Sequence, residues 1–164
     1  MVGNIYSGLV DAGFDQKSIW ITSTWRDSNK QAYLTSKKNP PNPTNFSYHI
    51  VITEPPDSDY YEPQAYAVDI SYPMGKAGSK ERERQEEFYK KLGELVEKED
   101  LTWGGTFKVK AYHSAYKHDR KRRTGIGWAP QHMSLRKVLN STQRGEIKAE
   151  TKRIYKKLGQ TELK

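Results

Sequence analysis

Two histidines and one aspartate have the residue types and spacing that could hold a metal ion. His49 and Asp69 lie in stretches that we expect to form neighbouring strands. Side chains on adjacent strands can face one cleft, and a second histidine would complete a set of two histidines and one carboxylate. Catalytic zinc sites use three protein ligands and leave a fourth position for water. A hydrogen-bonded histidine beside a surface aspartate is the alternative that this spacing leaves open.

The third ligand has more than one candidate. The chain has four histidines and no cysteine, so a metal site must use histidine and carboxylate side chains. His132 precedes Met133, while His113 and His118 compete with it. No pair of histidines has the i, i+4 helical spacing of a zinc-protease helix. The residues alone therefore leave the choice open.

Two charged features could also take part in chemistry. Arg26 follows an expected strand at residues 18–24, and an arginine can grip a carboxylate through two parallel hydrogen bonds. Residues 119–123 (DRKRR) form a basic run, which usually indicates a solvated loop. A nucleic-acid-binding arm is the alternative for this run, but the sequence has no helix-turn-helix, zinc-finger or RNA-binding sheet signature.

The elements that must position these residues follow from hydrophobic periodicity. Residues 79–100 form the clearest helix, with Phe88, Leu92 and Val96 on one face and Ser79 as N-cap. Strands are expected at 18–24, 46–53, 65–72, 101–116 (interrupted by two glycines) and 131–135, a loop at 118–127, and helices at 27–34 and 140–158. This order predicts an α+β fold with a small, mostly antiparallel sheet flanked by helices.

Charge is concentrated in the last third of the chain. The 164 residues carry a net charge of +8, made up of −4 over residues 1–105 and +12 over residues 106–164. A basic surface attracts nucleic acid, anionic lipid or anionic cell-wall polymer without choosing among them. No apolar run approaches the ~20 residues of a membrane helix, and we expect no signal peptide.

Several short segments, taken in order, resemble a known family. They are residues 21–27 (ITSTWRD), 31–34 (QAYL), 47–49 (SYH), 67–70 (AVDI), 101–105 (LTWGG) and 131–133 (QHM). They resemble the zinc D-Ala-D-Ala carboxypeptidases and L-alanyl-D-glutamate endopeptidases of bacteria and phages, which share the hedgehog-type metallopeptidase fold. The resemblance extends from about residue 14 to residue 135.

The resemblance implies roles for particular residues. His49, Asp69 and His132 would hold Zn²⁺, with His113 as the rival third ligand, and Arg26 would bind a carboxylate of the peptidoglycan stem peptide. The metal would lower the pKa of its water and polarise the scissile carbonyl. A carboxylate three residues before the last histidine would be the general base.

The chain departs from the family pattern in spacing and at the base. Nineteen residues separate His49 from Asp69, so we expect an insertion at residues 50–64, and a second insertion at 108–127. Ala129 stands at the general-base position. Either Asp119 or an acidic residue within 54–62 would then serve as the base, or catalysis would be weakened.

These observations predict a metallopeptidase-like domain over residues 1–139 and a basic helical extension over 140–164. The expected function is zinc-dependent hydrolysis of peptidoglycan stem peptides, as in an endolysin that degrades the cell wall. The alternative is a catalytically impaired structural or cell-wall-binding protein of a phage particle. Expected partners are the stem peptide, anionic cell-wall polymer and other virion proteins, and nucleic acid ranks last. The expected location is a virion, or a host cytoplasm with action on the wall.

Overall fold

The computed structural model describes residues 1–23, 49, 66–146 and 148–149. The chain divides into two compact units, one of Met1–Thr22 with Asp69–Lys137 and one of Ser23–Val68 with Val138–Lys164. Arg26, the expected helix at 27–34 and the acidic stretch at 54–62 lie outside the described residues, as does the expected strand at 46–53 apart from His49.

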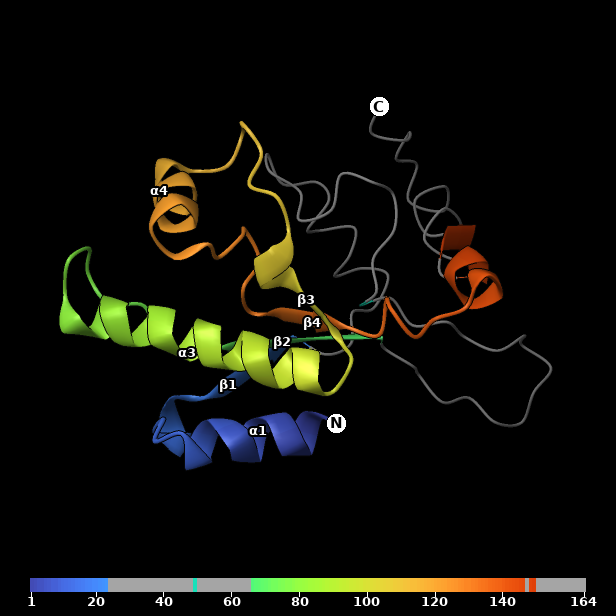
Figure 1. The fold of residues 1–164 in the computed structure, drawn as a ribbon, viewed down its shortest axis with the longest axis horizontal. Coiled ribbons are helices and arrows are strands. Elements are labelled where there is room, and N and C mark those ends of the chain that lie inside the picture. The colour runs from blue at the N-terminus through green and yellow to red at the C-terminus, as the bar shows by residue number, and fades with distance from the viewer. Residues whose placement is uncertain (24–48, 50–65, 147, 150–164) are drawn as a thin grey trace. The chain divides into compact units, whose positions relative to one another are not determined.

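The described elements confirm an α+β architecture (Figure 1). In chain order they are α1 (Val2–Asp11), the 3₁₀ turn η1 (Gln16–Ser18), β1 (Trp20–Ser23), β2 (Ala67–Ser71), α3 (Lys80–Lys98), β3 (Thr102–Trp103), the 3₁₀ turn η2 (Gly104–Thr106), α4 (Ala115–Thr124) and β4 (His132–Ser134). Over the described residues the strands form one sheet in the order β1-β2-β4-β3. β3 and β4 are antiparallel, with Thr102 opposite Ser134 and Trp103 opposite Met133.

Helix α3 begins where the sequence predicts. The Ser79 hydroxyl accepts a hydrogen bond from the Arg82 N–H at 3.2 Å, which satisfies one of the unpaired donors of the first turn. Phe88, Leu92 and Val96 are each fully buried. The predicted apolar face of this helix is therefore confirmed.

The core of the first unit lies between α3 and the elements that contact it. Figure 1 shows α1 beside α3, and the two helices are in contact. A Cβ at Gly8 would lie 2.7 Å from a methyl carbon of Leu95, so glycine lets the helices approach closely. Phe88 packs edge-on against Phe14 at 5.2 Å and stacks on Tyr72 at 4.7 Å, between ring centroids. These aromatic rings compensate for a composition that is only 34% hydrophobic.

Two of the expected elements differ in the structure. The strand expected over 101–116 is limited to β3 and then becomes the turn η2. The loop expected over 118–127 is mostly helix, because α4 occupies Ala115–Thr124. Gly125 ends α4 with φ of 76°, a left-handed conformation that glycine adopts without strain.

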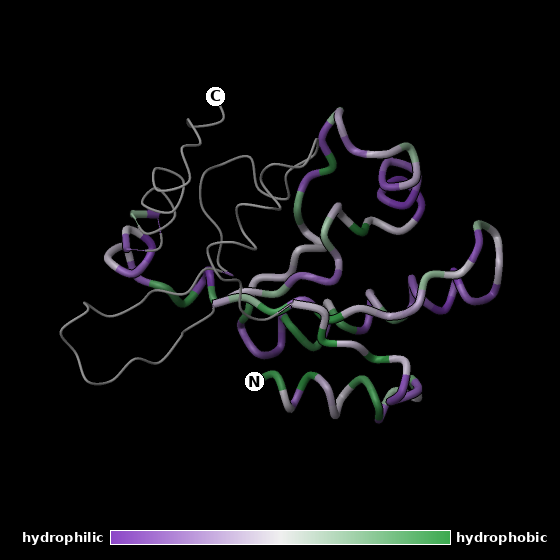
Figure 2. The backbone as a smooth tube through the Cα atoms, turned by 180° about the vertical axis from the view of Figure 1, so that it is seen from behind, coloured by the Kyte–Doolittle hydropathy of each residue, from purple (hydrophilic) through white to green (hydrophobic). Residues whose placement is uncertain are grey.

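Charge pairs within α4 explain why the hydrophobic pattern did not reveal this helix. Asp119 pairs with Arg122 at 2.9 Å and with Arg123 at 2.8 Å, at the i+3 and i+4 positions that face each other on a helix. Figure 2 shows α4 as a largely hydrophilic segment. Three basic residues in its last turn also complement the helix dipole.

The second unit is described in part. Residues 141–146 and 148–149 are helical, which agrees with the start of the helix expected at 140–158. Asn140 and Gln143 form reciprocal hydrogen bonds of 2.9 and 3.0 Å between side chain and backbone N–H, a capping box. Within the described part of the chain, no helix combines the length and the apolar character needed to cross a membrane.

Candidate metal centre

Asp69 and His132 are placed together by neighbouring strands. The Ile70 N–H donates a hydrogen bond of 2.8 Å to the Gln131 carbonyl, which aligns β2 with the start of β4. Successive side chains of a strand point to opposite faces. Ile70 and Met133 are buried in the core at 0% and 2% exposure. Asp69 and His132 therefore share the other face of the sheet.

The two side chains are already close to a ligand geometry. Nδ1 of His132 lies 3.1 Å from Oδ1 of Asp69, and the side chains are only 14% and 15% exposed. Two donor atoms bound to one tetrahedral zinc at about 2.0–2.2 Å would lie roughly 3.3 Å apart. The observed separation of this pair therefore needs little adjustment to bind a shared ion.

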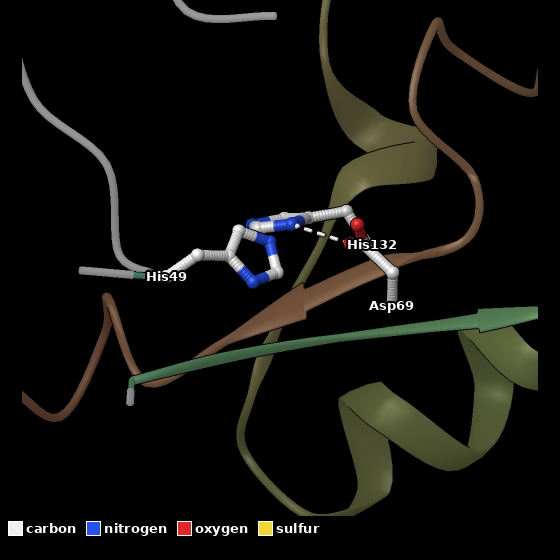
Figure 3. A group of neighbouring side chains, drawn as sticks. All are labelled: His49, Asp69 and His132. Carbon is white, nitrogen blue, oxygen red and sulfur yellow. Dashed lines mark hydrogen bonds and ion pairs between the residues drawn. The ribbon is translucent and has the colours of Figure 1, made fainter. Parts of the chain in front are cut away.

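His49 completes a group of three candidate ligands. Each of His49, Asp69 and His132 offers one ligand atom, and these atoms all lie within 4.8 Å of one another. Figure 3 shows the three side chains pointing toward one another. His49 is only 4% exposed. The group could hold a metal ion, and two imidazoles with one carboxylate suit zinc among several transition metals.

The Trp-Gly-Gly segment supports the strand that carries His132. Nε1 of Trp103 donates a hydrogen bond of 2.7 Å to the Pro130 carbonyl. A Cβ at Gly104 would lie 2.1 Å from the Ala129 carbonyl oxygen and 2.8 Å from the His132 Cβ. Glycine is therefore required at this position, and the segment acts by positioning His132.

Two hydroxyl groups near the centre were not singled out from the sequence. Ser134 follows His132 by two residues on β4, so its side chain points to the same face. Thr102 lies opposite Ser134 in the β3–β4 register. Among the described residues, both hydroxyl oxygens are buried without a hydrogen-bond partner. The two-residue alternation from His132 would have identified Ser134.

His113 lies outside the group of candidate ligands. Its Nδ1 accepts a hydrogen bond of 3.0 Å from the Lys110 N–H, and its ring lies 5.1 Å from that of Trp128. Partial burial, followed by the positive charge of Lys117, lowers the pKa of His113 and favours the neutral ring. The geometry thus favours His132 over His113 as the third ligand.

Asp119 is also outside this group, on α4. Hydrogen bonds from Arg123 and Arg122 hold its pKa below the ordinary value of 3.8. A carboxylate stabilised in its charged form accepts a proton poorly. The geometry gives no support to Asp119 as general base, and Ala129 has no proton-accepting side chain. Arg26 lies outside the described residues.

No protein-family model, curated protein or solved structure matches this chain. The class of protein is therefore assigned from the fold and the candidate site. It is an α+β protein with a candidate metal centre of two histidines and one aspartate.

Proposed function

We propose that the chain is a zinc-dependent peptidase that acts on peptidoglycan stem peptides, of the carboxypeptidase or L-alanyl-D-glutamate endopeptidase type. The observation that carries the proposal is the convergence of His49, Asp69 and His132, whose ligand atoms lie within 4.8 Å of one another. These are the ligands implied by the resemblance to the zinc carboxypeptidases and endopeptidases. Bound zinc would lower the pKa of a coordinated water and polarise the scissile carbonyl.

The protein's own residues would hold and orient the reacting groups. Asp69 supplies the anionic ligand, and the imidazole of His132 must be neutral to bind a metal. Arg26 is proposed to bind a carboxylate of the stem peptide.

The general base is missing from its expected position. Ala129 stands there, and Asp119 is held by two arginines. Losing a positioned base typically lowers the rate by about 10²–10⁴-fold. We therefore expect slow turnover unless a carboxylate of residues 54–62 takes this role.

The same observation favours a second candidate function. A peptidase-fold protein that retains the metal ligands but lacks a base would bind cell-wall peptide without cutting it. Such a protein would fit a structural or cell-wall-binding role in a phage particle.

Both candidate functions require a bound metal ion, and the metal content of the protein tests this requirement. The chain is expressed with added zinc, and bound metal is measured by inductively coupled plasma mass spectrometry. We expect bound zinc in the wild type and its loss in His49→Ala and His132→Ala. His113→Ala and His118→Ala are matched controls that should retain the metal. A zinc-free wild type, or ligand variants that keep their zinc, would contradict the metal centre.

Turnover separates the two candidates. Purified peptidoglycan is incubated with the zinc-loaded protein, and new free amines are measured. Amine release that disappears in His49→Ala supports the peptidase. Peptidoglycan binding with no amine release, in a protein that holds zinc, supports the second candidate instead.

A further inference from the structure

Three side chains at the contact of α3 and α4 carry buried polar atoms that lack a hydrogen-bond partner in the part of the chain that the structure describes. Arg82 belongs to α3, while Tyr116 and Arg120 belong to α4. Among the described residues, Nη1 of Arg82, the hydroxyl of Tyr116 and Nε of Arg120 have no hydrogen-bond partner. Unsatisfied buried donors are costly, so a group of them at one place calls for a partner such as a water molecule or an ion.

Both guanidinium groups lie against the aromatic ring of Tyr116, which carries the third polar group. The guanidinium carbon of Arg82 lies 4.2 Å from the centroid of the Tyr116 ring, and that of Arg120 lies 5.4 Å from it. Cation–π contacts of this kind orient a guanidinium and leave its N–H edge free to donate. Two guanidinium groups are therefore gathered beside the ring that carries the unpaired hydroxyl.

Neither guanidinium is neutralised by a carboxylate of the described residues. The acids at this helix contact are used by another arginine: Glu86 accepts hydrogen bonds of 2.8 and 3.1 Å from Arg123, and Asp119 binds Arg123 at 2.8 Å. Arg82 and Arg120 instead donate to backbone carbonyls, those of Gly75 and Gly127. Within the described ranges, the contact thus keeps two positive charges without a carboxylate partner.

The guanidinium of Arg120 carries a buried positive charge, which calls for a partner of opposite charge. Arg120 is only 5% exposed, and a buried charge without a partner strongly destabilises a fold. The ammonium of Lys117 is close enough that burial and then the charge of Arg120 lower its pKa. Arg82 and Tyr116 are partly exposed, so the cluster reaches the surface.

We propose that Arg82, Tyr116 and Arg120 form a binding site for phosphate, either as the free ion or as a phosphate group on a larger molecule. Guanidinium groups match the oxygens of a phosphate through paired hydrogen bonds. A phosphate dianion would neutralise both charges and accept a third hydrogen bond from the tyrosine hydroxyl. This site shares no residue with the candidate metal centre.

Calorimetric titration with inorganic phosphate tests the proposal. The full chain is titrated at constant ionic strength, set with chloride. Tyr116→Phe keeps the ring and removes the hydroxyl, and Arg82→Gln removes one charge. Hydrogen bonds to a charged group are worth enough that each change should weaken binding roughly tenfold or more. The buried Arg120 is left intact, because its replacement endangers folding.

Two matched variants separate this site from the general charge of α4 and from the metal centre. Arg122→Gln makes the same charge change on α4 at a side chain that is 81% exposed, so phosphate affinity should stay at the wild-type value. His132→Ala removes a candidate metal ligand, so binding that persists in it does not depend on the metal centre. Phosphate binding lost in His132→Ala would overturn the proposal.

A second titration with glycerol 3-phosphate shows whether the site binds the free ion or a phosphate group on a larger molecule. If it binds and competes with inorganic phosphate, the site accepts a phosphate carried on a larger molecule. If only inorganic phosphate binds, the ligand is the free ion. The absence of saturable phosphate binding, or binding that is equal in the wild type, Tyr116→Phe and Arg82→Gln, would overturn the proposal.

Discussion

His132 is held in place from two sides. Its Nδ1 lies 3.1 Å from the Asp69 carboxylate, and its Cβ faces Gly104, where an added Cβ would lie only 2.8 Å from it. A metal ligand that is fixed before the ion arrives loses little conformational freedom on binding. Changes at either neighbour should therefore alter metal affinity without touching the imidazole.

Asp69→Asn tests whether the carboxylate binds the metal, because the substitution removes the charge and keeps the shape of the side chain. The amide can still hydrogen bond to His132, but it lacks the negative charge that offsets the charge of the ion. We expect zinc affinity to fall by more than the roughly 10–100-fold typical of an outer-shell change. Competition with a chromogenic chelator measures it, and an unchanged dissociation constant would rule Asp69 out as a ligand.

Gly104→Ala tests the support behind His132. The added methyl would lie 2.1 Å from the Ala129 carbonyl oxygen, so the chain must shift. Overpacking of this kind typically destabilises by about 1–3 kcal/mol. We expect a lower melting temperature and weaker zinc binding. Gly3→Ala is the matched control, because a Cβ there meets nothing within 4 Å. Equal metal affinity in both variants would contradict the positioning role.

At the scale of elements, ionic contacts join α4 to α3. Arg123 bonds both to Asp119 on its own helix and to the buried Glu86 on α3. This pairing raises the pKa of Arg123 above its already high ordinary value. Among the residues that the structure describes, it also leaves Arg82 and Arg120 without an acidic partner, which is the condition for the proposed phosphate site.

The pairing of Asp119 predicts a particular dependence of stability on pH. Its folded pKa is lower than the ordinary 3.8, so the stabilisation is present above that value and is lost as the pH falls through the folded pKa. Asp119→Asn should therefore lose less stability than the wild type on acidification below 3.8. Melting temperatures across an acid series measure this, and identical profiles would contradict it.

At the scale of the whole molecule, the ligands come from distant parts of the sequence. Asp69 and His132 are 63 residues apart, so an ion bound by both would bind the folded chain and not the unfolded one. Ligands of this kind stabilise a protein by about 4 kcal/mol at 1,000 times the dissociation constant.

Metal removal should consequently lower stability. We expect a chelator to reduce the melting temperature of the zinc-loaded wild type and to leave that of His132→Ala unchanged. Differential scanning calorimetry measures both. An equal effect of the chelator on the two proteins would mean that the stabilising metal is bound elsewhere.

The sequence by itself determined the elements with strong local signals. The Ser79 cap and the spacing of Phe88, Leu92 and Val96 specify α3, because capping and helical periodicity are properties of neighbouring residues. The short strand expected at 131–135 is present as β4. Helix α4 was missed, because ion pairs and a glycine cap stabilise it in place of an apolar face.

Only the tertiary structure decided how the candidate site is assembled. The residue types and spacing alone left His113 as a rival of His132, and the adjacency of β2 and β4 brings His132 beside Asp69. Helix packing likewise brought Arg82 and Arg120 against the Tyr116 ring. Both outcomes depend on contacts between residues far apart in the chain. Strand order and helix packing determine such contacts, and hydrophobic periodicity or capping in the sequence does not predict them.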